Sequence, residues 1–257
     1  MSTVAVAKMH GTFNDFAIVD GRSQQIEDLQ RFARAVCDRR GGVGADGLIV
    51  LLASGVADAR MRILNADGSE AEMCGNGMRC AVRYLSELGE GDRFRIETLA
   101  GVIGAEVLEK GEEYRVRLNM GAPHLEFQAL PFPNAASVSV GNPHIVIFRT
   151  ALDEFDLPAA GRTMPQTNVH AAVVVDRHHI DARHYERGVG LTYACGTGAV
   201  ACAAAAIDRK LCDSPVDVHV PGGVLRIEWD GKGDAYLTGP AVRVFDANVR
   251  QIDAVPL

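Results

Sequence analysis

The chain has 257 residues, which is enough for one large domain or two of moderate size, and either can bury a core. Apolar residues make up 47% and charged residues 23%, as in an ordinary soluble globular protein. The net charge of −7 argues against nucleic acid as the main partner, because phosphate binding needs a basic surface.

The N-terminal residues show no basic start followed by a long apolar stretch and a cleavage site, so we expect no signal peptide. The longest apolar runs, Gly47–Leu52 and Ala199–Ile207, are too short to cross a bilayer. We therefore expect a cytoplasmic protein with no membrane partner. Its six cysteines show no CxxC spacing of the kind found in zinc or redox sites, and we expect them to be reduced.

Short β-rich segments bounded by Gly, Pro and Asp recur along the whole chain. In chain order they are Gly47–Leu52, Met61–Leu64, Phe94–Thr98, Val102–Leu108, Tyr114–Leu118, Ser137–Val140, Ile145–Phe148, Ala171–Asp176, Val216–Val220, Val224–Trp229 and Ala241–Phe245. Helix signals are fewer. Gln24–Asp38 is amphipathic and Met78–Leu88 partly apolar, whereas Ala199–Leu211 is apolar on nearly all sides and is predicted to be a core helix surrounded by strands.

An internal repeat links the two halves of the chain. Cys74-Gly75-Asn76-Gly77 matches Cys195-Gly196-Thr197-Gly198, and each copy continues into a helix-like stretch rich in Ala and Cys. Ala100–Glu106 matches Gly222–Glu228 at almost the same separation, and Asn14-Asp15-Phe16 matches Asn142-Pro143-His144 more weakly. Three matches in one order indicate two homologous halves.

We predict an α/β (α+β) fold of two pseudo-symmetric halves, each a mixed β-sheet wrapped around a central helix. The boundary is expected near Gly121–Pro123. The first half, residues 1–121, carries Cys74 and is completed by the C-terminal segment 246–257, and the second half, residues 122–245, carries Cys195. No flexible Gly/Ser linker separates them, so we expect tight packing with a cleft between the halves.

The two CGxG elements have the features of a chemical site. The glycines permit a sharp turn and close backbone approach, and the first amides of a helix have no partner within it. Such amides attract a carboxylate, and the helix dipole favours the thiolate of a nearby cysteine. Two such elements on opposite sides of one ligand would suit inversion of an amino-acid α-carbon, with one sulfur removing a proton and the other returning one.

A single cysteine before a helix is more often a buried structural residue than a catalyst. Two cysteines in matching elements at one repeat separation, Cys74 and Cys195, favour the catalytic interpretation. The other four, Cys37, Cys80, Cys202 and Cys212, lack the CGxG element, and we expect them to be small core residues.

The segments around both cysteines resemble a known family. Asn65–Cys80 is similar to the first catalytic motif of diaminopimelate epimerases, and Glu186–Ala199 resembles the second. Further matches, in the family's order and over nearly the whole chain, are Lys8–Gly11, Asn14–Phe16, Gly41–Asp46, Gly141–His144, Asn168-Val169, Pro221–Gly223 and Leu237–Pro240.

The resemblance implies an epimerase that interconverts LL- and meso-diaminopimelate in the synthesis of lysine and peptidoglycan precursors, with no cofactor and no metal, often as a homodimer. It implies Cys74 and Cys195 as the acid/base pair and the amides of Gly75, Asn76, Gly196 and Thr197 as the carboxylate site. For the distal amino-acid group it implies Asn65, Asn142, Asn168, Glu186 and Arg187, with Asn14 lining the pocket and with His144 and Glu186 near the cysteines, where they influence the cysteine pKa values.

Each of these polar residues also has a plainer interpretation. Glu186 and Arg187 could form a solvated surface pair, the asparagines could cap turns, and His144 could be a hydrogen-bonded core histidine. Three departures from the family pattern affect the choice of substrate. Phe13 stands where the family usually has Gly, Gly47 stands where many members have Gln, and the segment before Asn168 is several residues short.

Three other functions compete with this interpretation. One is a cofactor-free racemase or epimerase of the same fold that acts on another amino acid, such as histidine or proline. Another is a thiol redox protein that uses a disulfide between Cys74 and Cys195, although the sequence has neither a CxxC nor a GxGxxG cofactor signature. The last is a non-catalytic amino-acid-binding protein, which would have no need for both thiols.

Overall fold

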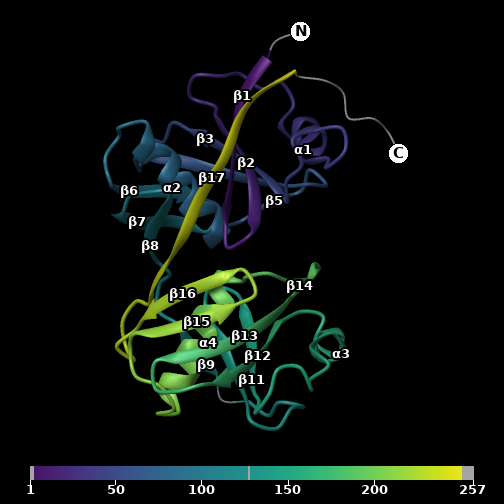
Figure 1. Cartoon of the computed structure of the whole chain (residues 1–257), viewed down its shortest axis with the longest axis vertical. Helices are drawn as coiled ribbons and strands as arrows, with labels where there is room; N and C mark the ends of the chain where they lie inside the picture. Colours follow the sequence, from purple (N-terminus) through teal and green to yellow (C-terminus); the bar gives the residue numbers. More distant parts are fainter. Residues whose placement is uncertain (1–2, 127, 251–257) are drawn as a thin grey trace. The chain divides into compact units, whose positions relative to one another are not determined.

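The computed structural model describes residues 3–126 and 128–250, which form 17 strands and four helices (Figure 1). In the first part of the chain these are β1 (Thr3–Gly11), β2 (Asn14–Asp20), α1 (Leu29–Cys37), β3 (Gly47–Leu52), β4 (Ala59–Asn65), β5 (Glu70–Ala71), α2 (Gly75–Glu87), β6 (Arg93–Thr98), β7 (Gly101–Glu109) and β8 (Glu113–Asn119). They continue with β9 (His124–Glu126), β10 (Ala135–Ser139), β11 (Pro143–Phe148), α3 (Leu157–Thr163), β12 (Asn168–Val174), β13 (His179–Glu186), β14 (Gly190–Thr192), α4 (Gly196–Asp208), β15 (Val216–Val220), β16 (Gly223–Glu228) and β17 (Tyr236–Arg250).

The chain divides into two compact units. Unit 1 runs to Arg117 and resumes at Pro240, and unit 2 runs from Leu118 to Gly239. Both boundaries lie earlier than the predicted ones at 121/122 and 245/246. The second differs because β17 is one uninterrupted strand that pairs with β16 at its start and with β1 farther on. Of the predicted completing segment 246–257, residues 251–257 lie outside the described residues.

The two units repeat the same strand pairings. In unit 1, β1/β2 is antiparallel, β2/β3 parallel, β3/β4 and β4/β5 antiparallel, β4/β6 parallel and β6/β7 antiparallel. In unit 2, β10/β11, β11/β12, β12/β13, β13/β14, β13/β15 and β15/β16 follow in the same sequence of directions. Helix α2 follows β5 in the first series and α4 follows β14 in the second, so the repeat seen in the sequence extends over the whole of each unit.

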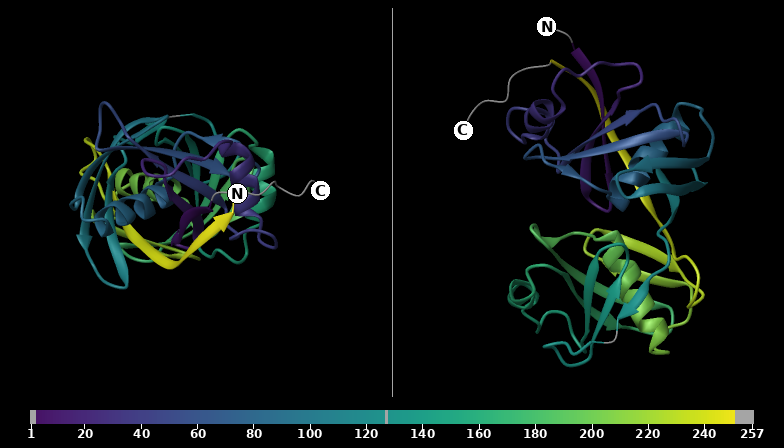
Figure 2. Two further views of the ribbon diagram at one scale, coloured as in Figure 1. Left: turned by 90° about the horizontal axis from the view of Figure 1, so that it is seen from above. Right: turned by 180° about the vertical axis from the view of Figure 1, so that it is seen from behind.

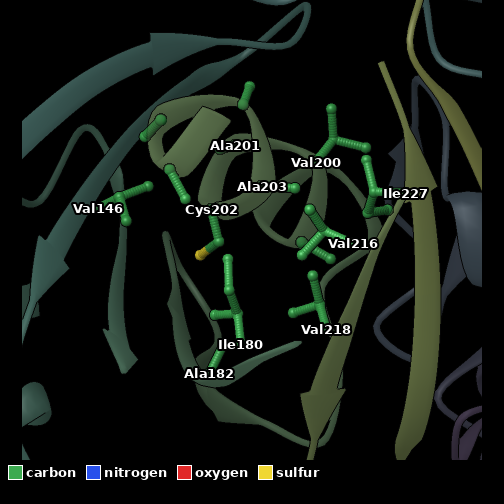
Figure 3. Packing of buried hydrophobic residues seen from close by; sticks show 14 of the residues in the cluster. Val146, Ile180, Ala182, Val200, Ala201, Cys202, Ala203, Val216, Val218 and Ile227 are labelled. Atoms are coloured by element: carbon green, nitrogen blue, oxygen red, sulfur yellow. The ribbon is translucent and has the colours of Figure 1, made fainter. Parts of the chain in front are cut away.

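Helix α4 forms the centre of unit 2, as its apolar sequence predicts. It contacts β10, β11, β12, β13, β15 and β16, and the side chains from Gly198 to Ala206 are buried. Figure 3 shows Val200, Ala201, Cys202 and Ala203 of α4 among residues of the surrounding strands, including Ile180 and Val218. Small side chains on every face let strands approach the helix from all sides.

Unit 1 has the same plan with a more polar central helix. Helix α2 contacts β1, β2, β3, β4 and β7, and it buries Met78, Cys80 and Leu85. A second apolar cluster lies between α1 and the sheet, where Phe32 and Val36 pack with Leu48. Asp28 caps α1 by accepting a hydrogen bond from the Arg31 amide. Strands β1 and β17 run side by side in this unit (Figure 2).

The mixed α+β fold is confirmed, and the sequence missed only some of its elements. It did not predict β1, β2, β5, β9, α3, β13 or β14. Helix α3 had a recognisable signal, because Asp156 caps it and Pro158 lies in its first turn. Helices α2 and α4 begin at Gly75 and Gly196, earlier than predicted, because the CGxG glycines are helical residues. Within the described residues no helix is long and apolar enough to span a membrane.

Replacing Ile180 by Ala should destabilise unit 2 by roughly 2–5 kcal/mol, because the side chain is fully buried against α4 and its removal leaves a cavity. Denaturant unfolding followed by circular dichroism would measure the change. The matched control is Val175→Ala, since Val175 is 57% exposed and its truncation should cost about 0.5 kcal/mol or less. Equal losses from both variants would contradict the placement of this core.

Candidate active site

Cys74 and Cys195 occupy equivalent places in the two units. Each is the N-cap residue of a 13-residue helix and has extended backbone angles, with φ −143° and ψ 116° at Cys74 and φ −123° and ψ 113° at Cys195. The first turn closes through the bonds from Met78 N to Cys74 O (2.8 Å) and from Ala199 N to Cys195 O (2.9 Å). The amides of the three residues after each cysteine therefore have no acceptor within the helix and point out of its positive end.

The second glycine of each CGxG is needed for close packing. A Cβ at Gly77 would lie 2.9 Å from Ile49 Cδ1 and 3.3 Å from the Phe16 ring. A Cβ at Gly198 would lie 2.5 Å from His170 Cε1. These glycines therefore let the first turn of each helix rest directly on the neighbouring strands, whereas the sharp turn expected at them does not occur, because both have helical backbone.

Cys74 is partly buried and faces two asparagines. Its thiol donates to Asn14 Oδ1 (3.6 Å), which also accepts from Asn76 Nδ2 (3.2 Å). The structure thus brings together three residues that the sequence assigned to the site. An amide oxygen can only accept, so the Cys74 thiol is the donor in this contact.

Asn14 is held in this orientation by charged residues behind it. Its Nδ2 donates to Asp46 (2.8 Å), which also pairs with Arg39 (2.7 Å). Arg39 and Lys8 in turn bind Asp15 at 2.9 and 2.5 Å. Burial alone would raise the pKa of Asp15, but the hydrogen bonds from Arg39 and Lys8 outweigh it and lower that pKa to about 2. The sequence assigned no role to Asp46 or Arg39, although Asp46 ends one of the family-like segments.

Arg79 holds the side chain of Asn76, the other asparagine near Cys74. Its side chain is completely buried, and it donates to Asn76 Oδ1 (2.9 Å) and, across the unit 1 core, to the Pro240 carbonyl (2.9 Å). Burial lowers the pKa of Arg79 to about 10. An arginine in the second turn of α2 thus orients the Asn76 side chain. Only its position two residues after the CGxG element could have indicated this.

Cys195 lies in a more enclosed and acidic environment than Cys74. Burial and then the Glu186 carboxylate raise the pKa of Cys195 well above its usual value, and the Thr197 hydroxyl and Gly198 amide only partly oppose them. Thr197 Oγ1 is 3.6 Å from the sulfur. The expectation that the helix dipole would enrich the thiolate is therefore wrong for Cys195 in the protein without ligand. Burial beside an anion outweighs the effect of the dipole on the thiol pKa.

Glu186 is the last residue of β13 and Arg187 follows it, and their side chains lie in different environments. Burial raises the pKa of Glu186, while hydrogen bonds from Thr192 (2.6 Å) and Cys195 oppose the shift. Arg187 is exposed, with Nη1 3.4 Å from the Gln166 carbonyl, and its amide donates to Asn168 Oδ1 (2.9 Å). Asn168 also reaches the Pro143 carbonyl (3.3 Å), so it joins the ends of three strands.

The side chains of Asn142 and His144 form a hydrogen bond, with His144 Nε2 2.6 Å from Asn142 Oδ1. His144 is fully buried, and its other ring nitrogen contacts His170, which contacts His184 in the same way. Burial, with a smaller contribution from His184, lowers the pKa of His144 to about 3. The structure thus gives His144 the geometry of a hydrogen-bonded core histidine. The sequence did not anticipate His170 or His184, because single histidines in apolar strands carry no signal.

The remaining predicted residues and departures lie in unit 1. Asn65 is exposed and bonds to Ser69 Oγ (2.9 Å), as in a turn. Gly47 pairs with Asn65 in the β3/β4 ladder, and a Cβ there would lie 2.9 Å from the Leu64 carbonyl. Phe13 is 63% exposed with φ 63°, and its ring stacks on His10 at 5.1 Å. A non-glycine residue in this left-handed region costs about 1–2 kcal/mol, so the β1/β2 turn keeps a glycine-like shape despite Phe13.

The strand registers show which side chains occupy equivalent positions in the two units. Phe16 pairs with Gly47 in unit 1, and His144 pairs with Asn168 in unit 2. Ile49 pairs with Ile63, and His170 pairs with His184. Phe16, Ile49 and Ile63 of unit 1 therefore correspond to the three histidines of unit 2, and Gly47 corresponds to Asn168.

The other four cysteines, Cys37, Cys80, Cys202 and Cys212, are buried to 3% exposure or less, in agreement with the prediction that they are core residues. All six cysteines are free thiols. Within residues 3–126 and 128–250, no group of three or more His, Cys, Asp and Glu side chains is arranged to hold a metal ion.

Comparison with known proteins identifies the family. A family model described as diaminopimelate epimerase matches residues 6–126 and 136–244. The diaminopimelate epimerase of Desulforudis audaxviator is 43% identical over 268 residues, covering 93% of this chain and 96% of that protein. This chain belongs to the diaminopimelate epimerase family. The diaminopimelate epimerase of Moorella thermoacetica is 42% identical with the same coverage, so the family predicted from the two CGxG segments is confirmed.

Solved structures of more distant proteins share the fold. A phenazine biosynthesis protein of the PhzF family from Bacillus anthracis has a TM-score of 0.77 at 21% identity and covers 97% of this chain and 100% of its own. A hydroxyproline epimerase from Agrobacterium vitis has a TM-score of 0.74 at 14% identity and covers 98% and 93%. At these identities the likeness concerns the two-unit architecture of the epimerase fold alone.

Replacing Glu186 by Gln should lower the pKa of Cys195, because a carboxylate beside a thiol disfavours the thiolate and the amide carries no charge. The effect should appear at pH values above the pKa of Glu186, where the wild-type carboxylate is ionised. Thr197→Val should shift the Cys195 pKa upward, since the hydroxyl bond that favours the thiolate is lost.

Both shifts can be measured from the ultraviolet thiolate absorbance of a Cys74→Ser background, after subtraction of the Cys74→Ser/Cys195→Ser double variant. The buried Cys37, Cys80 and Cys202, whose pKa burial raises to about 12, contribute equally to both proteins. Shifts of the same sign in the two variants would show that charge and hydrogen bonding do not control this thiol.

Proposed function

We propose that this protein interconverts LL- and meso-diaminopimelate by a cofactor-independent two-base reaction, with Cys74 and Cys195 as the acid/base pair. The observation that carries the proposal is that both cysteines cap the amino ends of the equivalent central helices α2 and α4 of two repeated units. Family membership supports the isomerase activity and its place in lysine biosynthesis.

The reaction requires one thiolate and one thiol on opposite faces of the α-carbon. The thiolate takes the α-proton and becomes a thiol, and the electron pair left on carbon is shared with the substrate carboxylate. The other thiol then gives its proton to the opposite face and becomes the thiolate. One proton is taken and one is returned, so the configuration is inverted and the pair is ready for the reverse direction.

The extra charge on the carboxylate would be stabilised by the amides of Gly75, Asn76, Gly196 and Thr197. They belong to the first turns of α2 and α4, where amides lack acceptors within the helix and the dipole attracts anions. Their positions are fixed before the reaction by the buried helices, so they need no reorganisation as the charge develops.

Each sulfur has a neighbour suited to its role. Glu186, whose pKa is raised by burial, accepts a hydrogen bond from Cys195 and can take up its thiol proton, leaving a thiolate beside a neutral carboxylic acid. Cys74 donates to the neutral Asn14 oxygen and starts as the proton donor. His144, the other residue expected near the cysteines, acts on this site through Asn142.

The distal amino-acid group would be bound by Asn65, Asn142, Asn168, Glu186 and Arg187. Arg187 is exposed and has a guanidinium that can bind a carboxylate with two parallel hydrogen bonds. A diamino diacid presents such a second carboxylate and ammonium, whereas histidine and proline do not. Asn65 and Asn168 already bond to Ser69 and to the Arg187 amide, so they would contribute their remaining hydrogen-bonding capacity.

Cys74→Ser and Cys195→Ser should each reduce kcat/KM for epimerisation by roughly 10²- to 10⁴-fold, the usual contribution of a positioned acid or base. The measurement is exchange of the α-hydrogen in deuterated water, starting from LL- and from meso-diaminopimelate. Cys202→Ala is the matched control, because Cys202 lies in the same helix as Cys195 but is a core residue.

The alternatives predict different results. α-Hydrogen exchange with histidine or proline but not with diaminopimelate would assign another substrate. Retention of full activity in either serine variant would exclude the two-base mechanism. If oxidation abolishes activity, reductant should restore it, whereas an activity that depends on the oxidised form would favour the redox alternative.

We also propose that the protein works in the cytoplasm as a homodimer. Six free thiols fit a reducing compartment, and the family resemblance supports the dimer. Light scattering coupled to size-exclusion chromatography of the 27.5 kDa chain should give twice this mass, and a monomer mass at micromolar concentration would exclude a stable dimer.

A further inference from the structure

Three buried imidazoles form a hydrogen-bonded chain behind Asn142. His144, His170 and His184 lie on the adjacent strands β11, β12 and β13, and all three are completely buried. His144 Nδ1 is 2.8 Å from His170 Nε2, and His170 Nδ1 is 2.8 Å from His184 Nδ1. The chain ends at Asn142 Oδ1 on one side and on the other at His184 Nε2, which has no hydrogen-bond partner among the described residues.

All three rings are neutral under ordinary conditions. Burial lowers the pKa of His144 and of His184 to about 3 and that of His170 well below its usual value. A neutral imidazole carries one ring proton, so each ring donates through one nitrogen and accepts through the other. Each ring–ring contact therefore contains a single proton.

The contact with Asn142 decides the direction of the whole chain. A carbonyl oxygen such as Asn142 Oδ1 can only accept, so His144 carries its proton on Nε2 and must accept through Nδ1. His170 then donates from Nε2 and accepts through Nδ1, and His184 donates from Nδ1. The unpartnered His184 Nε2 is thus a bare lone pair, which avoids an orphaned buried N–H.

The fold does not require histidines at these positions. The register-equivalent residues of unit 1 are Phe16, Ile49 and Ile63, which fill the same places beside α2 with apolar side chains. Polar rings in a core must be hydrogen-bonded to be tolerated, and here one nitrogen is left without a partner. The three rings cost free energy of folding because one buried nitrogen has no partner, and the first ring is hydrogen-bonded to Asn142, a candidate site residue. This combination indicates that the rings serve the site.

We infer that His170 and His184 are positioning residues that lock the side-chain amide of Asn142 with its oxygen toward His144 and its NH₂ group turned to the ligand. The locked amide offers two N–H donors to an acceptor, and a substrate carboxylate is the matching group. The identity of this ligand as diaminopimelate rests on the proposed function, whereas the tautomer order does not.

The tautomers can be measured directly in the whole protein labelled with ¹⁵N-histidine. Long-range ¹H–¹⁵N correlation spectra separate the two neutral forms of each ring, and single His→Gln variants assign the signals. We expect His144 and His170 as Nε2–H tautomers and His184 as the Nδ1–H tautomer. A protonated ring in this set, or His184 as the Nε2–H tautomer, would overturn the inference even if the protein epimerises diaminopimelate.

A pair of variants at His170 tests the positioning role. His170→Gln keeps an N–H to donate to His144 and an oxygen to accept from His184, whereas His170→Met has similar length and neither group. We expect His170→Met to raise KM for diaminopimelate roughly three- to tenfold with kcat within about twofold, the effect of losing one oriented hydrogen bond in substrate binding. His170→Gln should keep KM near the wild-type value.

The outcomes separate this inference from the proposed function. Equal KM values in the two variants, in an active and folded protein, would exclude positioning through His170. If His170→Met does not fold, the wild-type tautomers and the KM of His170→Gln test the inference instead. A KM for His170→Gln as high as the KM of an Asn142→Ala variant would then overturn it. If the wild type does not act on diaminopimelate, the proposed function fails, and the tautomer order still decides whether Asn142 is locked.

Discussion

The first amides at the amino ends of the two central helices are the feature on which the rest of the structure depends. A helix end inside a protein must have its first amides satisfied by a cap, water or a ligand. In α2 and α4 the cap residue is a cysteine, so the first amides of each helix lie beside a sulfur, and the Gly198 amide bonds to the sulfur of Cys195. The surrounding strands hold each helix in place. Gly77 in α2 and Gly198 in α4 allow the first turn of the helix to pack directly against these strands. In the proposed mechanism, the carboxylate site and the proton-transfer group would be built from the same few residues.

The duplication supplies this element twice, but the two units surround it with different chemistry. In unit 1 the sulfur contacts the neutral amide of Asn14, which is held by Asp46 and, behind it, by the Arg39–Asp15 ion pair. In unit 2 the sulfur lies beside the half-buried Glu186, and strands β11, β12 and β13 carry histidines in place of Phe16, Ile49 and Ile63. The same framework therefore holds the two sulfurs in different chemical surroundings.

Several features of this arrangement could be predicted from the sequence, because they leave local signals. The CGxG pair marks both helix starts, and the all-apolar Ala199–Leu211 segment predicts the enclosed helix of unit 2. The N-terminal strands and β13 were missed because their burial depends on partners far along the chain, such as β17 for β1. The contacts of Arg79, Asp46 and His170 were missed for the same reason, since each joins segments that are distant in sequence.

The pKa of Cys195 is raised, although its place before a helix predicts a lowered pKa, and the cause cannot be read from the local sequence. A cysteine before a helix predicts a lowered pKa from the dipole, and that argument needs only local residues. The observed rise comes from burial and from Glu186, which is nine residues earlier in the chain and reaches the sulfur only because β13 and β14 form an antiparallel pair. The pKa of Glu186 is raised as well, because the same burial disfavours a charge on either group. The enclosed site therefore keeps the Cys195 sulfur protonated in the protein without ligand.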